Sequence, residues 1–302
     1  MSLTASLHTA NFHEVDKHFH LPEISVDHGL SYLANCSILF ADRPLLERPA
    51  AARAAGFDAV EFWWPFPTAT PPETEVDRFV AAVNDAGVRL VGLNFAAGDM
   101  PAGDRGLLSW PGRSGEFLAS VETAVAIGGR LGTTAFNALY GNRLEGTASE
   151  EQDDLAAENL ARAAQAAGRI GATVLVEPVS GAPRYPLLTA DDVVAVIDRV
   201  QREAGVDNVR LLADLFHLAV NGDDLAAVVA RYADRVGHVQ IADAPGRHEP
   251  GTGELDLAVH VRALEAAGYA GWVGLEYVPE TTTEAGLGWL PRERRAAPVP
   301  TS

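Results

Sequence analysis

Short apolar runs alternate with helical patterns along most of this chain of 302 residues. Eight runs rich in β-branched and aromatic residues are each followed by a stretch with helical periodicity. The runs are residues 32–37, 59–62, 89–94, 133–137, 173–177, 209–214, 237–241 and 273–276. A closed parallel barrel has eight strands that alternate with helices. The sequence therefore predicts an α/β protein with a (β/α)8 barrel.

Turn and capping residues support the helices between these runs. Ser149 with Gln152 predicts a capping box at the start of a helix that ends near Gly168, and Thr189 with Asp192 predicts a second cap. Three turns place a glycine between a helix and the next strand, at Gly56, Gly87 and Gly268. We expect these glycines to adopt the left-handed conformation that closes a helix.

The alternating pattern fills residues 29–292, which we expect to form one barrel domain because no linker rich in Pro, Gly or Ser divides it. Residues 1–28 show no periodicity and are expected to form an N-terminal arm, with residues 293–302 as a C-terminal tail. The arm contains histidines at positions 8, 13, 18 and 20, whose spacing matches no set of metal ligands. The role of the arm stays open.

The chain is strongly acidic, with a formal net charge of −18 from 23 basic and 41 acidic residues. This charge repels phosphate backbones and anionic lipids, so it argues against nucleic-acid and membrane partners and favours small molecules. No window approaches the 18 or so consecutive apolar residues that a membrane helix needs. The single cysteine, Cys36, excludes an intrachain disulfide and predicts a cytoplasmic protein. A homo-oligomer is left open.

The chain has one lysine, Lys17, which lies in the expected arm. Schiff-base chemistry, pyridoxal phosphate anchoring and a P-loop all need a lysine on the scaffold. Residues 36–40, at the end of the first apolar run, contain no glycine, so the fingerprint of a dinucleotide-binding fold is missing as well. These observations argue against Schiff-base chemistry, pyridoxal phosphate, a P-loop and a dinucleotide-binding fold.

Polar residues close the last four apolar runs, at Glu177, Asp214, Gln240 and Glu276. Active sites of (β/α)8 barrels lie at the C-terminal ends of the strands, and consecutive strands bring those ends to one rim. Strand periodicity turns all four toward the barrel axis if their apolar neighbours face the helices. The competing interpretation is that each acidic residue only caps the following helix.

Three carboxylates at one rim cannot all ionise without a cation between them. Oxygen ligands alone favour a hard ion such as Mg²⁺ or Mn²⁺, and zinc is less natural with this set. We therefore predict a divalent metal site built from Glu177, Asp214, Gln240 and Glu276.

Several segments resemble the hydroxypyruvate isomerase family, within the wider xylose-isomerase-like group of sugar isomerases and epimerases. The resemblance runs from about residue 30 to 290. The matching segments are residues 98–99, 103–106, 214–217, 237–243, 247–254, 271–277 and 284–289. The segments 247–250 (RHEP) and 286–289 (GLGW) are specific to this branch.

The resemblance implies a xylose-isomerase-like TIM barrel that holds a divalent metal with the same four residues. It also implies that Glu177 and Glu276 are the acid and base on opposite faces of the substrate. In related epimerases the histidine of the Asp-x-x-His segment contacts substrate, which gives that role to His217. The parent group usually has histidine where this chain has Gln240, so the identity of the metal stays open.

The implied reaction interconverts hydroxypyruvate and tartronate semialdehyde. A proton leaves the hydroxyl-bearing carbon, an enediolate forms, and a proton returns to the neighbouring carbon. A metal and two carboxylates suffice for these steps, so no organic cofactor is expected. Such a substrate carries a carboxylate, whose counter-ion should be arginine because the barrel lacks lysine. Arg105 and Arg247 are the candidates, since both lie in loops that follow strands, although each could be a solvated surface residue.

Other polar residues have weaker assignments. Glu61 ends the second run beside a series of aromatic residues that could roof a pocket or meet a partner subunit, and it is a candidate substrate contact. Asn94 and Asn137 end the third and fourth runs and could bind substrate or cap helices. His248 could contact substrate or shape its loop, and His238 is expected to be a buried core histidine.

Three other functions compete with this one. A 2-oxo-tetronate isomerase would use the same residues on a substrate one carbon longer. A DNA repair enzyme of the endonuclease IV type shares the barrel, but its three zinc ions need histidines where this chain has Asn94 and Asn137. A barrel that only binds a ligand would not need the pair Glu177 and Glu276.

Overall fold

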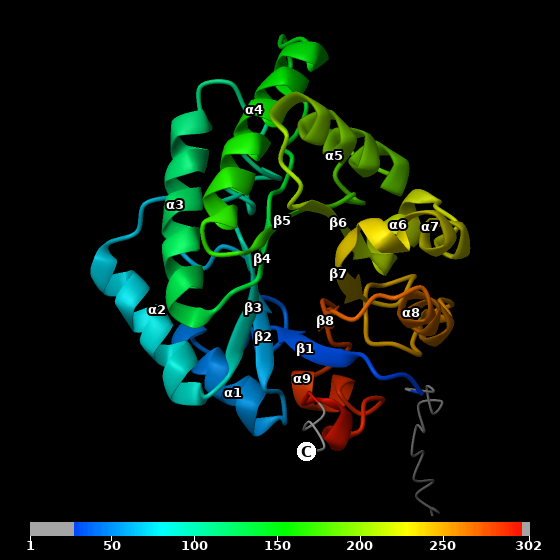
Figure 1. The fold of residues 1–302 in the computed structure, drawn as a ribbon. Helices are drawn as coiled ribbons and strands as arrows, with labels where there is room; N and C mark the ends of the chain where they lie inside the picture. Colours follow the sequence, from blue (N-terminus) through cyan, green and yellow to red (C-terminus); the bar gives the residue numbers. More distant parts are fainter. Residues whose placement is uncertain (1–26, 298–302) are drawn as a thin grey trace, which may run out of the picture.

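The computed structural model describes residues 27–297, so nearly all of the expected N-terminal arm lies outside the described residues. In the described part, eight parallel strands pair in sequence order and close into a barrel (Figure 1). The strands are β1 (Ser31–Asn35), β2 (Ala59–Phe62), β3 (Arg89–Asn94), β4 (Ala135–Asn137), β5 (Thr173–Val176), β6 (Val209–Asp214), β7 (Val236–Ile241) and β8 (Trp272–Leu275). Pairing of β8 with β1 closes the ring and confirms the predicted fold class.

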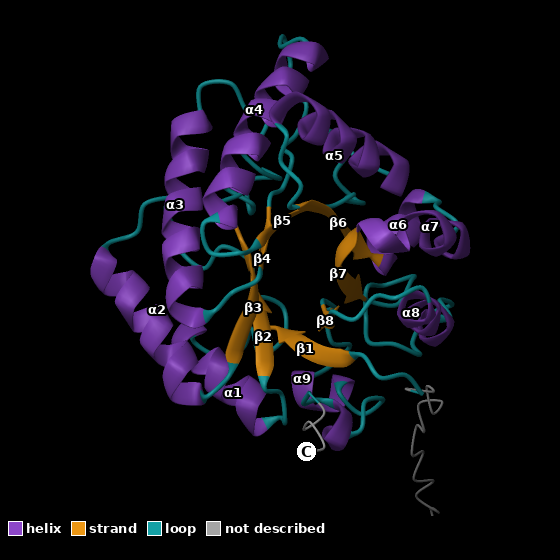
Figure 2. Cartoon of the chain, in the orientation of Figure 1, coloured by secondary structure: helices purple, strands orange, loops and turns teal. Residues whose placement is uncertain are grey.

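Helices surround the strands on the outside of the barrel (Figure 2). The helices are α1 (Arg48–Ala54), α2 (Glu73–Ala86), α3 (Ser114–Leu131), α4 (Ser149–Gly168), α5 (Ala190–Ala204), α6 (Leu215–Asn221), α7 (Leu225–Tyr232), α8 (Leu257–Ala266) and α9 (Thr283–Gly286). Short 3-10 helices are η1 (Leu45–Glu47), η2 (Ala233–Arg235) and η3 (Arg292–Arg294). No helix within residues 27–297 is long and apolar enough to cross a membrane.

Alternation along the strands separates two cores. Outward side chains such as Val176, Ala213 and Val239 join the large core beneath the helices. Inward apolar side chains form two small clusters inside the barrel, of which Leu33 and Leu212 are members. Burying one Val or Leu side chain stabilises the folded state by about 1.5–3 kcal/mol. The alternation of apolar residues therefore determines which face of each strand points to the barrel axis. The polar residues at the strand ends therefore face inward.

The two predicted capping boxes have different outcomes. Thr189 Oγ1 accepts the backbone N–H of Asp192, whose carboxylate accepts the N–H of Thr189, so the box at the start of α5 is confirmed. The box predicted for Ser149 and Gln152 is wrong, because no side chain caps α4. The Gln152 side chain is buried and instead donates to two loop carbonyls, including that of Asn142.

The predicted turns and boundaries are close to those observed. Gly56, Gly87 and Gly268 all have positive φ, and Gly87 closes α2 in the left-handed conformation. The first strand ends at Asn35 rather than residue 37, because residues 36–41 form turns. The predicted boundaries of β2, β3 and β6 match the structure, and the other strands differ by one or two residues at an end.

The C-terminal segment packs against the loop after β1, where Thr283 Oγ1 of α9 accepts the backbone N–H of Phe40. The Arg295 guanidinium donates to the carbonyls of Ala55, Leu287 and Leu290. Residues 295 and 297, which fall in the predicted C-terminal tail, thus make hydrogen bonds to the domain.

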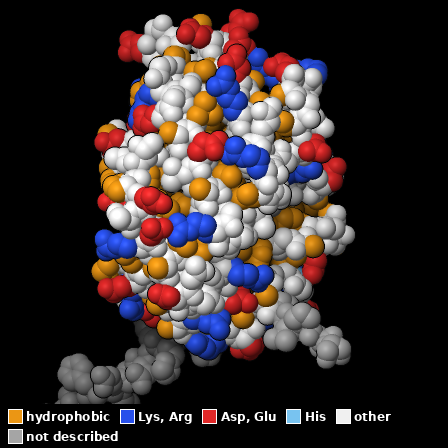
Figure 3. Space-filling model, turned by 60° about the vertical axis from the view of Figure 1, so that its left-hand side comes forward, with side chains coloured by type: hydrophobic (Ala, Val, Ile, Leu, Met, Phe, Trp, Pro, Cys, Tyr) orange, Lys and Arg blue, Asp and Glu red, His pale blue; other side chains and the backbone are white. Residues whose placement is uncertain are grey.

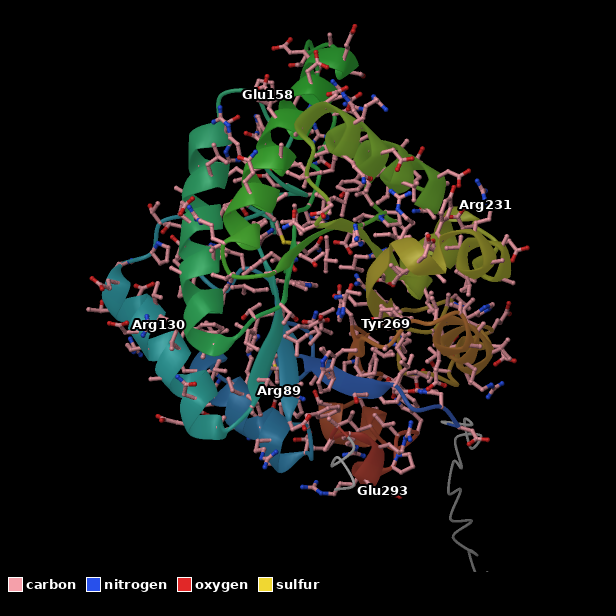
Figure 4. All side chains as sticks on the ribbon, in the orientation of Figure 1. Arg89, Arg130, Glu158, Arg231, Tyr269 and Glu293 are labelled. Carbon is pink, nitrogen blue, oxygen red and sulfur yellow. The ribbon has the colours of Figure 1, made fainter. Side chains whose placement is uncertain are left out.

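Ion pairs connect neighbouring outer helices. Arg130 of α3 pairs with Asp77 of α2 at 2.8 Å, and Arg231 of α7 pairs with Asp191 of α5 at 3.2 Å. Figure 4 labels Arg130 and Arg231 on this outer layer, while other side chains fill the interior. These pairs are exposed, so each contributes only about 0–1 kcal/mol to the stability of the folded state.

Candidate active site

Four polar side chains from the last four strands lie at the C-terminal rim of the barrel. Asp214 of β6 and Gln240 of β7 are register partners, while Glu177 and Glu276 directly follow β5 and β8. Their exposed fractions lie between 1% and 6%. The structure thus places all four predicted donors at one end of the barrel, with their apolar neighbours turned toward the helices.

Glu177 and Glu276 are each held by an asparagine. Asn137 Nδ2 donates to Glu177 Oε1 at 2.8 Å, and Asn35 Nδ2 donates to Glu276 Oε2 at 2.8 Å. Burial raises the pKa of Glu177 to about 8, although the hydrogen bond from Asn137 opposes the shift. Burial also raises the pKa of Glu276 well above its ordinary value, against the opposing charge of Arg247. Burial therefore opposes the ionisation of both carboxyl groups, and at Glu276 the charge of Arg247 favours it.

Asp214 and Gln240 each use one polar atom and leave the other unpartnered. Asp214 Oδ1 accepts the backbone N–H groups of Phe216 and His217, so this oxygen caps α6 as the competing interpretation expects. Gln240 Nε2 donates to Glu61 Oε1 at 2.8 Å. Asp214 Oδ2 and Gln240 Oε1 are buried without a hydrogen-bond partner in the described part of the chain. Buried polar atoms are rarely left without a hydrogen bond, so these two oxygens have acceptor capacity that the described residues do not use.

The donor set fits a hard divalent cation. Two unpartnered oxygens lie beside two buried carboxyl groups, and oxygen ligands suit Mg²⁺ and Mn²⁺. Among residues 27–297, no three His, Cys, Asp or Glu side chains are arranged as a metal centre in this structure. Arg247 is the cation present instead, with Nη2 at 2.6 Å from Glu276 Oε1 and 3.7 Å from Asp214 Oδ2.

The loop after β7 holds Arg247 over the rim. The fully buried carboxylate of Asp243 accepts backbone N–H groups of Ala244, Gly251 and Leu255, which fixes the course of the loop. Arg247 itself has φ +60°, a conformation that is uncommon for a residue other than glycine. Burial lowers its pKa, but the adjacent carboxylates raise it more, so the guanidinium stays charged. Nη2 of Arg247 is therefore already engaged by two carboxylates, while its Nε is buried without a hydrogen-bond partner among the described residues.

A cavity of about 490 Å³ opens above these residues. Loops after six of the strands contribute to its wall. The lining residues are Trp63, Asn94, Met100, Pro101, Arg105, Leu139, Glu177, Val179, Ser180, His217, Arg247 and Glu276. Six of the predicted site residues therefore share this cavity. Asp214 and Gln240 are not in its wall and lie buried at the rim.

The loop after β3 presents Arg105 to the cavity. Arg105 Nη1 donates to the carbonyls of Met100 and Asp104, and within the described residues its other nitrogens have no protein partner. The next residue, Gly106, has φ +114°, and a Cβ there would overlap the Leu139 carbonyl. The glycine thus allows this loop to pack against the loop after β4. Arg105 is left as a cation with free donors in the cavity.

His217 lies beside the carboxyl groups in a defined orientation. Its Nδ1 accepts the backbone N–H of Ser180 at 3.1 Å and lies 2.7 Å from Ser180 Oγ. Burial lowers the pKa of His217, which favours the neutral ring. With Nδ1 as acceptor, Nε2 carries the proton and can donate, and it lies 3.6 Å from Asp214 Oδ2.

Other predicted residues lie differently. Glu61 is buried inside the barrel and does not line the cavity, because its side chain bonds to residues of β1 and β7. His248 is also absent from the wall, since its Nδ1 lies 2.7 Å from the Val278 carbonyl and anchors the loop. His238 is buried as expected. Asn94 lines the cavity, and Asn137 supports Glu177.

Sequence reasoning missed Asn35 and Ser180. Asn35 is the last residue of β1 and faces inward. The search for polar residues at strand ends would have found it if the end of this strand had been predicted at residue 35 instead of residue 37. Ser180 lies in the loop after β5 and had no signal, because a single loop serine is not informative. Of the aromatic residues that could roof a pocket or meet a partner subunit, Trp63 lines the cavity and Phe66 is buried against Phe79.

Known proteins share this architecture along most of the chain. Residues 49–293 match a family described as xylose isomerase-like TIM barrel. The chain is 54% identical over 268 residues to a putative hydroxypyruvate isomerase of Streptomyces coelicolor, covering 87% of this chain and 96% of that one. It is 35% identical over 261 residues to a 2-oxo-tetronate isomerase of Cupriavidus necator, covering 86% and 96%.

A solved structure described as an AP endonuclease, family 2, from Brucella melitensis has a TM-score of 0.78 and 34% identity, and the match covers 86% of this chain and 97% of that one. The curated relatives confirm the resemblance to the hydroxypyruvate isomerase family, and their names are isomerase names. This chain belongs to the xylose isomerase-like TIM barrel family.

Proposed function

We propose that the protein is a metal-dependent hydroxypyruvate isomerase. The observation that carries this proposal is the pair Glu177 and Glu276, two buried carboxyl groups that line one cavity and whose pKa values are raised by burial. Carboxyl groups of this kind can hold or release a proton near neutral pH, which is what an acid–base pair needs. The names of the relatives support the reaction class.

The reaction moves one hydrogen between neighbouring carbons. One carboxylate removes a proton from the hydroxyl-bearing C3 of hydroxypyruvate, which gives an enediolate. The other carboxyl group returns a proton to C2, and the hydroxyl proton passes from the oxygen on C3 to the oxygen on C2. The oxygen on C3 thereby becomes the aldehyde of tartronate semialdehyde. No atoms are gained or lost, so Glu177 and Glu276 exchange protonation states and no redox cofactor is needed.

We infer that Mg²⁺ or Mn²⁺ would be held by Glu177, Asp214, Gln240 and Glu276. The two unpartnered oxygens at this rim support the inference. A bound divalent ion would supply Lewis-acid stabilisation of the negative charge that develops on the substrate oxygens. Arg247, which pairs with Glu276 in this structure, would share these carboxylates with it.

Arg105 is the group that we expect to bind the substrate carboxylate. Arg105 lines the cavity and binds the protein only through Nη1 within the described residues, whereas Nη2 of Arg247 is paired with Glu276. His217 would donate from Nε2 to a substrate oxygen, because Ser180 holds Nδ1 as an acceptor. Trp63 and Leu139 add apolar wall that limits the access of water.

A 2-oxo-tetronate isomerase is the second candidate. The cavity of about 490 Å³ leaves room for a fourth carbon, and the relative from Cupriavidus necator carries that name. The proposed acid–base pair would act in the same way on either acid. We do not favour a DNA-directed function, because a net charge of −18 opposes phosphate backbones.

The decisive experiment offers both acids to the purified protein with Mg²⁺ or Mn²⁺ and follows the products by NMR in D₂O. We expect hydroxypyruvate to give tartronate semialdehyde that carries deuterium at C2, because a solvent-exchanged carboxyl group returns the proton. Chelation with EDTA should stop the reaction, and readdition of the ion should restore it. Faster turnover of 2-oxo-tetronate would select the second candidate, and conversion of neither acid would overturn both.

A further inference from the structure

Glu61 occupies a space inside the barrel that two glycines keep open. The residue lies in β2 and is 4% exposed. A Cβ on Gly274 of β8 would lie 2.6 Å from Glu61 Oε1, and a Cβ on Gly92 of β3 would lie 3.1 Å from Glu61 Cβ. The side chain therefore needs glycine on two other strands. It reaches across the interior without entering the substrate cavity.

Both oxygens of Glu61 have buried partners. Oε1 accepts Gln240 Nε2 at 2.8 Å and Asn35 Nδ2 at 3.1 Å. Oε2 lies 2.7 Å from His238 Nε2. Glu61 thus joins strands β1, β2 and β7 beneath the rim.

These contacts set the direction of the Gln240 amide. An amide has a donor end and an acceptor end, and only the donor end can bond to a carboxylate. Glu61 holds Nε2, so Gln240 Oε1 must point the other way, and it is this oxygen that is buried without a partner. Without an acceptor at Glu61, the amide could rotate and present N–H instead.

Asn35 connects Glu61 to Glu276 and so helps to orient the Glu276 side chain. Asn35 Oδ1 accepts the backbone N–H of Ser37 at 3.0 Å, which fixes the amide orientation. Its Nδ2 then bridges Glu61 Oε1 and Glu276 Oε2, at 3.1 and 2.8 Å. One buried carboxylate therefore orients a proposed metal ligand and one member of the proposed acid–base pair.

We propose that Glu61 is a positioning residue that aims the Gln240 carbonyl oxygen at the cation and holds Glu276 through Asn35. This inference rests on the proposed function, because it assumes the divalent ion at the rim. Outer residues that orient metal ligands typically contribute a factor of about 10–100 to metal affinity.

The test measures the Kd of Mn²⁺ by electron paramagnetic resonance in three variants. Glu61→Met keeps the bulk but removes the acceptor, and should raise Kd about 10–100-fold. Gly274→Ala keeps the carboxylate but crowds it, because the new Cβ would lie 2.6 Å from Glu61 Oε1 and 3.1 Å from Gln240 Cγ, and it should also raise Kd. Glu61→Gln should change Kd much less, because its carbonyl can still accept from Gln240 while its amide donates to the other tautomer of His238.

A double-mutant cycle shows whether Glu61 acts through Gln240. In a Gln240→Ala background, Glu61→Met should change Kd little, because no amide is left to orient. Leu212→Met is the matched control, since Leu212 is buried inside the barrel in a separate apolar cluster. It should bind Mn²⁺ like the wild type. Circular dichroism confirms that each variant is folded, and Gly274→Ala replaces Glu61→Met if the latter is not.

The outcomes separate the two proposals. If the wild type binds Mn²⁺ and both Glu61→Met and Gly274→Ala bind it equally well, the positioning role is overturned and the metal centre stands. If the wild type binds no Mn²⁺, the metal centre itself is overturned, together with the role of Glu61. A raised Kd in the two variants, with rescue in Glu61→Gln, supports the positioning role.

Discussion

Arg247 is the one positive side chain that the described structure places against both Glu276 and Asp214. Two acidic groups and one guanidinium leave the rim short of positive charge, and Glu177 adds a third carboxyl group nearby. Buried carboxyl groups without a cation respond by keeping their protons. A divalent ion would release those protons, so metal binding and proton chemistry are coupled at this rim.

Replacing either member of the proposed acid–base pair tests that chemistry directly. Glu177→Gln and Glu276→Gln keep the size of the side chain but remove the titrating group. Each should lower kcat for isomerisation by about 10²–10⁴-fold, the usual contribution of general acid–base catalysis. Progress curves on hydroxypyruvate measure this, with circular dichroism as the check on folding. Turnover near that of the wild type in both variants would remove the assignment.

Arg105 offers a separate test of substrate recognition. Arg105→Gln removes the cation that we expect to face the substrate carboxylate. Hydrogen bonds to charged groups contribute about 1.5–3 kcal/mol, so kcat/KM should fall roughly 10–100-fold. Arg130→Gln on the outer face of α3 is the matched control and should leave kcat/KM unchanged. Equal kinetics in both variants would place the carboxylate elsewhere.

The residues at the rim could be predicted because the end of each strand and the alternation of inward and outward side chains determine their positions. Glu177, Asp214 and Glu276 follow from counting along apolar runs, and the structure turns them inward. The depth of a side chain is less visible in a sequence. Glu61 also ends an apolar run, yet it lies beneath the cavity because glycines on β3 and β8 make room for it. Only the packing of three strands shows this.

At the scale of single elements, Thr189→Ala should destabilise the protein and Ser149→Ala should not. Thr189 caps α5 within a complete capping box, whose loss costs about 1 kcal/mol. The Ser149 side chain caps nothing, since α4 has no side-chain cap. Urea unfolding of both variants measures the free energy of unfolding. Equal losses would show that the sequence pattern alone predicts the cap.

The two helices explain why caps are harder to predict than strands. Both starts have a hydroxyl residue followed three positions later by a side chain that could complete the box. At α4 the Gln152 side chain instead donates hydrogen bonds to carbonyls in the loops after β3 and β4, which pack over it. A local pattern cannot show such competition, because the competing groups come from distant parts of the chain. The order of the strands, in contrast, could be predicted from the alternation of apolar runs and helical stretches alone.

For the whole molecule, the formal net charge is −18. On the face shown in Figure 3, acidic and basic side chains are interspersed. Ion pairs such as Arg235 with Asp198 link neighbouring parts of the helical layer. Mixed charge of this kind favours solubility over a directed interaction with a polyanion. The buried carboxyl groups at the barrel rim therefore dominate the pH dependence that is specific to the site.

The stability of the metal-free protein should fall as pH rises from about 5 to 8. Glu177 has a folded-state pKa of about 8 against an ordinary value of 4.5, and that of Glu276 is also raised. Between these values the folded state binds more protons than the unfolded chain, so each increase in pH favours unfolding.

The double variant Glu177→Gln, Glu276→Gln lacks both groups, and its melting temperature should therefore depend less steeply on pH across this window. Adding Mn²⁺ to the wild type should raise the melting temperature most near pH 8, because the ion binds ionised carboxylates and displaces their protons. Scanning fluorimetry from pH 5 to 8, with and without the ion, measures both effects. Identical slopes for the wild type and the double variant would show that these carboxyl groups are not buried with raised pKa values, and the proton chemistry proposed for them would then lack its physical basis.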